Sequence, residues 1–292
     1  MGKLFNYLIG LLFLLLFAVL SLTMCSKVDQ EVAKIEDLPM PSQYEIIQPV
    51  FRPEQEELDT LYIPVIILHG MWLSDQDHTY VQEMVHYTNR KLTGINIVFY
   101  ISDYKRVFFP LIEELKQDSY EEYYQYSEWY DDPDILSIWL LNEDKDNICE
   151  QGEDGVERCR RTNGWAFIGN ETTNNVVINK VDILNPHVLA HEIGHFFGLY
   201  HTFETRFGIE KVDGSNCETA GDLICDTPAD PNLADTFISY AQCESFYQNY
   251  RPQINNIMSY YHFCRDKPKK FSKDQLKVLR SQIESVYLQQ IK

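Results

Sequence analysis

Positive charge is scarce in this sequence. The 292 residues include 25 Lys and Arg against 44 Asp and Glu, for a formal net charge of −19. A surface of that sign would repel a phosphate backbone, so a nucleic-acid binder of the usual kind is excluded. Internal repeats and low-complexity tracts are also missing, and beyond the N-terminal region no apolar run is long enough to span a bilayer. The remainder has an ordinary globular composition, 45% hydrophobic and 24% charged, which suits one large domain or two small ones.

The N-terminal region holds the one long apolar run. Lys3 precedes a nearly unbroken run from Leu8 to Leu20, which has the length of the hydrophobic part of a signal peptide. The run leads into Cys25, and this pattern resembles a bacterial lipoprotein signal, although Met24 stands where a small residue is expected. We expect residues 1–25 to be a signal peptide and a lipidated Cys25 to anchor an exported protein at the cell envelope. Cleaved secretion and an uncleaved anchor are the alternatives.

Residues 26–60 are acidic and punctuated by proline, which predicts a tether or a short pro-arm. Ordered structure is expected over 61–292. Apolar runs at 61–69, 95–101, 135–141 and 174–181 predict four strands, and helical spacing predicts helices over 78–91 and 186–200. This order predicts an α/β (α+β) domain with a mixed sheet. A loop-rich segment follows residue 201 and ends in a helix that Ser272 and Gln275 begin with a capping box.

The stretch from His191 to His201 predicts a metal site. His191 and His195 lie four residues apart, so on a helix they share one face and can bind a single ion. Glu192 lies beside them, where its carboxylate can reach a metal-bound water without being a ligand. Gly198 permits a sharp turn that returns His201 as the third ligand. Three neutral imidazoles with an open fourth position are typical of catalytic zinc. The alternative is a helix whose histidines pack in a core.

Further motifs follow in order along the chain. They are His195-Phe-Phe-Gly-Leu-Tyr-His-Thr-Phe203, Gly221-Asp-Leu-Ile-Cys-Asp-Thr-Pro228, Asn256-Ile-Met-Ser-Tyr260 and Phe271-Ser-Lys-Asp-Gln275. With these motifs, roughly residues 61–292 resemble the pappalysin family of metzincin peptidases. The resemblance implies a metzincin-type catalytic domain with a twisted mixed sheet, an active-site helix and a loop-rich C-terminal subdomain stapled by disulfides.

The resemblance also implies roles for single residues. Glu192 would be the general base, Met258 would form the turn beneath the zinc, and Tyr260 would hydrogen-bond the developing oxyanion. Asp222, Thr227 and the carbonyl oxygen of Cys225 would bind a structural calcium ion, which prefers oxygen ligands. The alternative for Asp222 is a turn former that caps nearby backbone. The strand at 174–181 would form the exposed upper edge of the cleft, available to an extended peptide.

Six cysteines remain apart from Cys25, an even number that agrees with three disulfides in an exported protein. Cys149 and Cys159 flank an acidic loop that contains glycine, and they are predicted to pair. By resemblance, Cys217 would pair with Cys243 and Cys225 with Cys264.

The predicted function is zinc-dependent hydrolysis of peptide bonds in extended polypeptides. Substrates would be proteins or peptides, with Tyr261, His262 and Phe263 as the wall of the pocket for the residue after the cut. This wall offers no carboxylate for a basic side chain, so an apolar or mildly basic residue is expected there. A monomer is favoured. The alternatives are an inactive surface-binding protein on the same scaffold and a zinc hydrolase of non-peptide amides.

Overall fold

The computed structural model describes residues 60–70, 73–107, 120–141, 148–151, 157–160, 163–169, 173–231, 249–261 and 268–290. Contacts divide the chain into the units Met1–Gln48 and Pro49–Lys292, and all described residues belong to the second. The expected signal peptide, the tether up to residue 59, Cys25, Cys243, His262, Phe263 and Cys264 lie outside the described residues. Within the described ranges, no helix combines the length and hydropathy needed to cross a membrane.

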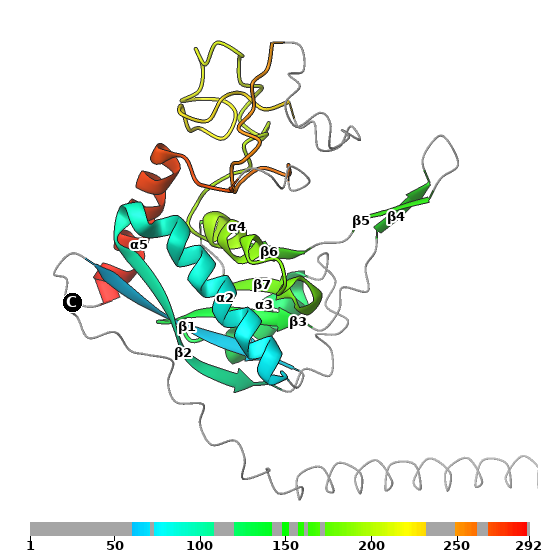
Figure 1. Ribbon diagram of the computed structural model, residues 1–292, viewed down its shortest axis with the longest axis vertical. Coiled ribbons are helices and arrows are strands. Elements are labelled where there is room, and N and C mark those ends of the chain that lie inside the picture. The colour runs from blue at the N-terminus through cyan, green and yellow to red at the C-terminus, as the bar shows by residue number, and fades with distance from the viewer. Residues whose placement is uncertain are drawn as a thin grey trace, which may run out of the picture. The chain divides into compact units, whose positions relative to one another are not determined.

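A five-stranded mixed sheet forms the centre of the domain (Figure 1), with strand order β2-β1-β3-β7-β6. The parallel strands are β1 (Leu61–His69), β2 (Ile97–Arg106), β3 (Leu136–Leu141) and β7 (Asn175–Asn179), and β6 (Gly164–Ala166) runs antiparallel to β7. Every residue of β3 and β7 is buried, because the sheet is covered on both faces. β3 is almost uniformly apolar, and β7 has an apolar centre between Asn175 and Asn179, which made both strands visible in the sequence.

Helices cover the two faces of the sheet unequally. Apolar side chains of α2 (Asp75–Leu92), α4 (His187–Phe196) and α5 (Lys273–Gln290) join the larger core cluster. The other face packs beneath α3 (Tyr120–Tyr130), where Tyr126 and Trp139 belong to a second, smaller cluster. Figure 1 shows α2 and α4 on the near side of the sheet and α3 behind it. The helix that bears the predicted metal ligands therefore lies on the more extensive core.

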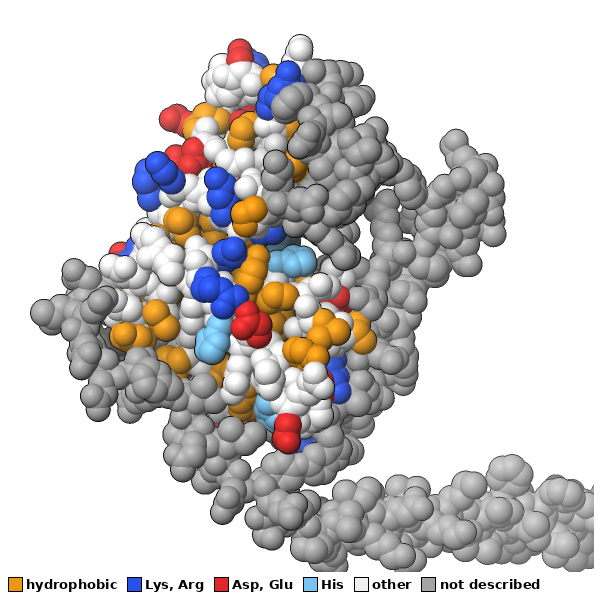
Figure 2. Space-filling model, in the orientation of Figure 1, with side chains coloured by type: hydrophobic (Ala, Val, Ile, Leu, Met, Phe, Trp, Pro, Cys, Tyr) orange, Lys and Arg blue, Asp and Glu red, His pale blue; other side chains and the backbone are white. Residues whose placement is uncertain are grey.

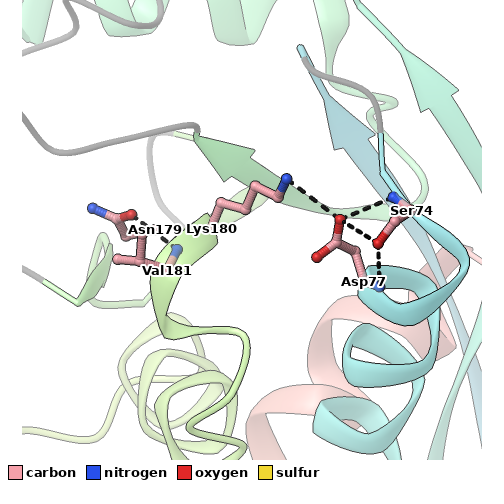
Figure 3. A network of polar contacts seen from close by, with 5 residues as sticks. All are labelled: Ser74, Asp77, Asn179, Lys180 and Val181. Atoms are coloured by element: carbon pink, nitrogen blue, oxygen red, sulfur yellow. Dashed lines mark hydrogen bonds and ion pairs between the residues drawn. The ribbon is translucent and has the colours of Figure 1, made fainter.

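A polar network fixes the start of α2 against the turn that follows β7 (Figure 3). Ser74 caps the helix, and its hydroxyl and backbone exchange hydrogen bonds with Asp77 in a capping box. Lys180 extends from the 3-10 turn η3 (Lys180–Asp182) and places its ammonium 3.3 Å from the Asp77 carboxylate. The Asn179 side chain accepts a hydrogen bond from the backbone of Val181 within the same turn. Since this turn leads into α4, the network anchors the approach to the metal-binding helix.

The predicted fold class is confirmed, since the domain has a mixed sheet, the expected helix and a loop-rich segment with a disulfide. The sequence did not reveal the short antiparallel hairpin of β4 (Ile148–Gln151) and β5 (Glu157–Arg160). This hairpin places Cys149 opposite Cys159, and the disulfide between them stays a prediction. The helix expected over 186–200 ends at Phe196, because Gly198 adopts a left-handed conformation.

The edge of the sheet differs from the expectation. The strand predicted at 174–181 corresponds to β7, which pairs with β3 on one side and with β6 on the other. It is therefore an inner strand, and the prediction that it forms the exposed edge was wrong. The three-residue strand β6 occupies the edge instead. Strand β6 is only three residues long and contains a glycine, so the sequence pattern did not predict it.

The disulfide in the loop-rich segment also differs from the expectation. Cys217 bonds to Cys225, and turns in the intervening chain bring their Cα atoms to 5.0 Å, within the usual range for a disulfide. A cysteine forms a single disulfide bond, so the predicted pairs Cys217–Cys243 and Cys225–Cys264 are wrong. The resemblance implied disulfides between distant cysteines, whereas Cys217 and Cys225 close a local loop.

The surface of the described part mixes charges. On the face drawn in Figure 2, Lys and Arg side chains lie among acidic, hydrophobic and uncharged ones. The acidic excess of the sequence is therefore not gathered on this face.

Candidate metal centre

Helix α4 carries the first two predicted ligands and ends where the third one requires it to end. Leu199 donates its backbone N–H to the Gly194 carbonyl, and Gly198 donates to the His195 carbonyl. Together with φ of +89° at Gly198, these bonds form a Schellman motif. The motif reverses the chain so that His201 returns to the face of α4 that bears His191 and His195, as the sequence predicted.

The three histidines meet at one point. Their Nε2 atoms form a triangle with edges of 3.1 Å between His195 and His191, 3.0 Å between His195 and His201, and 3.2 Å between His191 and His201. Ligand nitrogens placed tetrahedrally at zinc–nitrogen distances of 2.0–2.1 Å would lie about 3.3–3.4 Å apart. The triangle is thus close to the size that a single Zn²⁺ ion requires, and it is the one group of potential metal ligands found among the described residues.

Backbone carbonyls fix the tautomers of two of these rings. His191 Nδ1 lies 2.7 Å from the Ile257 carbonyl oxygen, and His195 Nδ1 lies 2.8 Å from the Leu199 carbonyl oxygen. A carbonyl only accepts hydrogen bonds, so each Nδ1 carries the proton and each Nε2 directs a lone pair towards the centre. Converging lone pairs repel one another unless a cation lies between them. The donor set therefore fits a metal ion.

Burial keeps the three imidazoles neutral. It lowers the pKa of His191, His195 and His201 to about 3, and repulsion between neighbouring rings adds to the effect. Neutral imidazole is the form that binds metal, so the site does not have to lose protons at neutral pH before it can accept an ion.

Glu192 directly follows His191 on α4 and is buried, with 5% of the residue exposed. Burial raises its pKa to about 8. A cation in the histidine triangle would lower that pKa again, because an opposite charge favours the ionised form. Gly164 of β6 makes room for this side chain, since a Cβ there would lie 3.2 Å from Glu192 Cγ and 2.6 Å from the Val177 carbonyl oxygen.

Met258 lies directly beneath the metal-binding helix. It is fully buried, and its sulfur occupies the space that a Cβ at Gly194 would need. The turn around it is held by Asn256, whose side chain accepts from the Met258 N–H at 2.8 Å and donates to Gln275 Oε1 at 2.9 Å. Gln275 Oε1 also accepts from the Ser272 N–H, as the predicted capping box requires. The first turn of α5 therefore supports the floor of the site, a connection that sequence spacing did not reveal.

Aromatic rings border the centre on its open side. Tyr260 is 41% exposed, and its ring centroid lies 4.6 Å from that of His201 and 5.9 Å from that of His191. Phe203 stacks on His201 at 4.7 Å with nearly parallel planes and also contacts Tyr260. The Tyr260 ring is therefore close to the metal ligands and accessible from solvent.

Tyr261, expected in the wall of a substrate pocket, is buried with 2% exposure. Its hydroxyl donates a hydrogen bond to Asp230 Oδ1 at 2.6 Å. A carboxylate from the loop-rich segment thus reaches the chain next to Tyr260. No motif pointed to Asp230 before the structure, because the contact depends on how the irregular loop folds.

A buried acidic pair lies in the predicted calcium loop. Asp222 is 2% exposed and accepts hydrogen bonds from the Thr227 hydroxyl at 2.8 and 2.9 Å and from the Ile224 N–H at 3.1 Å. Glu210 packs against Gly221, the neighbour of Asp222, and is 6% exposed. Burial raises the pKa of both carboxyl groups to about 7; the charge of Asp230 adds to the rise for Glu210, and the charge of Glu210 adds to the rise for Asp222. Cys225, the third predicted contributor, is held by its disulfide to Cys217.

Residues 172–284 match the family model for peptidase M43, described as pregnancy-associated plasma protein-A. An extracellular metalloprotease of Podospora anserina is 46% identical over 43 residues, which cover 15% of this chain and 11% of that protein. An extracellular metalloprotease of Sordaria macrospora is 35% identical over 72 residues, which cover 24% of this chain and 21% of that protein. The matched region thus spans about a fifth or less of the length of these curated relatives.

Among solved structures, archaemetzincin from Methanopyrus kandleri aligns with a TM-score of 0.40 at 11% identity, over 76% of this chain and 96% of that one. The family match is more specific, because its range includes the three histidines, Glu192 and Met258. Over residues 172–284, which hold the whole metal centre described above, this chain is similar to the pappalysin family of metallopeptidases.

Proposed function

We propose that the protein is a zinc endopeptidase that cuts extended polypeptides. The observation that supports this most is the convergence of three Nε2 atoms, two of them on the helix that also carries the buried Glu192. Zinc held by His191, His195 and His201 would supply a Lewis acid and lower the pKa of a bound water. The family match and the extracellular metalloprotease relatives agree with this function.

Two side chains would handle protons and charge in the reaction. Glu192 would take the proton of the attacking water and pass it to the leaving amine, since the residue lies on α4 between the ligands His191 and His195 in the sequence. The Tyr260 hydroxyl would donate a hydrogen bond to the oxyanion that develops on the scissile carbonyl. The proximity of its ring to His201 and its exposure support this assignment.

The test separates metal binding from catalysis. His195→Ala should abolish retention of zinc, measured by metal analysis of the purified protein. Glu192→Gln should retain zinc and lose at least about 10²-fold in the rate of peptide cleavage, the low end for general acid–base catalysis. His86→Ala, on an exposed histidine of α2, serves as the control and should change neither quantity. A Glu192→Gln variant with full activity contradicts the proposal, and a zinc-loaded wild type that cuts no peptide favours the inactive binding protein.

The substrate would add a strand to the edge formed by β6. Asn179 donates its N–H to the Asn163 carbonyl, so by alternation Trp165 makes the next bonded pair with β7. The backbone groups of Gly164 and Ala166 then face away from β7. An extended peptide can pair with them, next to Glu192.

The residue after the cut would lie against the segment that follows Met258. We keep the expectation that Tyr261, His262 and Phe263 contribute to this pocket and that it takes an apolar or mildly basic side chain. Tyr261 supports it from within, because the residue itself is buried.

A structural calcium ion at the loop of Asp222 is the second part of the proposal. Asp222, Thr227 and the Cys225 carbonyl would be joined by Glu210, which the sequence did not suggest. Two buried carboxylates with raised pKa values are costly to ionise without a cation, and oxygen ligands on a loop are what calcium prefers. The hydrogen bonds from Thr227 and Ile224 to Asp222 show that this side chain also shapes the turn.

Export is the third part. The N-terminal pattern predicts a signal peptide at 1–25 with lipidation at Cys25, and secretion after cleavage is the alternative. The Cys217–Cys225 disulfide fits an oxidising compartment, and the relatives are named as extracellular proteins. Mass spectrometry of the N-terminal peptide after expression in a bacterium would show whether Cys25 carries a lipid.

A further inference from the structure

The carboxylate of Asp230 connects two segments that lead away from the metal centre. Its Oδ2 accepts a hydrogen bond from the Thr202 hydroxyl at 2.7 Å, and its Oδ1 accepts one from the Tyr261 hydroxyl at 2.6 Å. Thr202 directly follows His201, and Tyr261 directly follows Tyr260. Each oxygen of one carboxylate therefore holds the neighbour of a residue in the site.

Because the surroundings are buried, the two hydroxyls are held in the positions that these hydrogen bonds require. Thr202 and Tyr261 are each 2% exposed, so neither hydroxyl has bulk water as a ready substitute partner. Hydrogen bonds to an ionised acceptor are shorter and stronger than those between neutral groups. Thr202 also donates its N–H to the Met258 carbonyl at 3.1 Å, which links the same two segments through the backbone.

His201 depends on this arrangement more than the other two ligands do. His191 and His195 lie on a regular helix, and carbonyl oxygens orient their rings. His201 lies in an irregular segment, where Phe203 stacks on its ring and Thr202 fixes the adjacent backbone. A shift of Thr202 would therefore move the third ligand directly.

We propose that Asp230 is a positioning residue of the metal centre, which sets the place of His201 through Thr202 and the place of Tyr260 through Tyr261. Asp230 lies in the same loop-rich segment as Asp222, and its negative charge also acts on Glu210. The part that concerns His201 requires only metal binding, whereas the part that concerns Tyr260 rests on the proposed peptidase function.

The two hydrogen bonds of Asp230 can be tested separately with the full chain. Thr202→Val removes the hydrogen bond from the Thr202 hydroxyl to Asp230, through which Asp230 acts on His201. It should weaken zinc binding by about 10- to 100-fold, the usual cost of losing a group that orients a ligand. Tyr261→Phe removes the hydrogen bond from the Tyr261 hydroxyl to Asp230, through which Asp230 acts on Tyr260. It should leave zinc affinity unchanged and lower kcat without raising KM. Asp230→Ala should show both effects, and Asp230→Asn, which keeps the shape and one acceptor, should show smaller ones. Zinc affinity is measured on metal-free protein by competition with a chelating dye.

Asp131→Asn is the matched control for a buried carboxylate that accepts several hydrogen bonds. Asp131 lies after α3 and accepts from Trp139 Nε1 at 2.8 Å, so its loss should lower thermal stability without changing zinc affinity. If Asp230→Ala loses as much stability as this control and keeps wild-type zinc affinity and kcat, the proposal is overturned. If wild type and variants all fail to cut peptides but the Thr202→Val and Asp230→Ala proteins lose zinc affinity, the positioning of His201 stands and the peptidase function falls.

Discussion

The sulfur of Met258 fills the place where a side chain at Gly194 would begin. Gly194 lies on α4 between the two helical ligands, and the Met258 Cε is also within 3.1 Å of an added Cβ. The glycine in the metal-binding motif is thus explained by packing, although the helix itself would favour alanine. It allows the turn of residues 256–260 to lie directly beneath the ligands.

Gly194→Ala should consequently disturb the site although alanine favours helices. The added methyl group would force Met258 to move, and overpacking of this kind costs about 1–3 kcal/mol of unfolding free energy. We expect a fall in melting temperature of about 2–4 °C for each kcal/mol lost. Thermal unfolding with and without zinc measures it. Gly94→Ala is the control, because the nearest atom to a Cβ there is Leu276 Cδ1 at an ordinary 3.6 Å. Equal stability of the two variants would contradict the packing argument.

The pKa values of Glu210 and Asp222 predict an unusual pH dependence. Both are raised to about 7 from ordinary values of 4.5 and 3.8, so the folded chain holds protons more tightly than the unfolded chain. The contribution of this pair to the free energy of unfolding should therefore fall as pH rises from about 4 to about 7 and then level off. Added calcium should reduce this fall if the ion binds the ionised pair.

Chemical denaturation at several pH values, with and without a calcium-selective chelator, measures the effect. Glu210→Gln should show a shallower fall than wild type in chelator and a smaller gain from calcium. The buried histidines contribute an opposite slope to both proteins, so the difference between the two curves isolates Glu210. Identical curves would remove Glu210 from the site.

Asp226 caps α5 from a distant part of the chain. Its carboxylate accepts from the Ser272 hydroxyl at 2.6 Å and from the Asp274 N–H at 3.0 Å. Asp226→Ala should cost about 1 kcal/mol, typical for loss of a helix cap. Asp213→Ala removes a carboxylate that accepts from the Ser215 N–H at 3.0 Å on an exposed loop, and it should cost much less. Denaturant titration compares the two, and a cost for Asp226→Ala no larger than for Asp213→Ala would speak against the cap.

Ala166→Pro tests the substrate edge. Proline removes the N–H that faces away from β7 and leaves the bonds between β6 and β7 in place. Loss of one backbone hydrogen bond of about 0.5–1.5 kcal/mol should raise KM by roughly 2- to 12-fold with kcat little changed. An unchanged KM would mean that the peptide does not pair at this edge.

The parts that the sequence predicted well are those with regular periods. The apolar strand at 61–69, the helix with His191 and His195, and the capping box of Ser272 with Gln275 depend on contacts within a few residues, which spacing records directly. The turn at Gly198 was equally predictable from the sequence, because few other residues adopt its backbone conformation.

The parts that were missed depend on contacts between distant segments. Asp230 bonds to Tyr261 across 31 positions and Asp226 bonds to Ser272 across 46. Neither segment has a periodic residue pattern from which its partner could be predicted. The pairing of Cys217 with Cys225 was missed for the opposite reason: a short loop closes it, whereas the expected partners were distant. Strand β6 escaped notice because three residues are too few for alternation to show.

The hydrogen bond between His191 and Ile257 spans 66 positions, and it sets the order in which the site can be completed during synthesis. A nascent chain that has emerged as far as residue 201 already contains all three ligands. It still lacks the carbonyl that orients one ring, the sulfur beneath the helix and the first turn of α5 that holds both in place. The ligands are thus made early, and the geometry that would let them act is acquired only when nearly the whole domain has been synthesised.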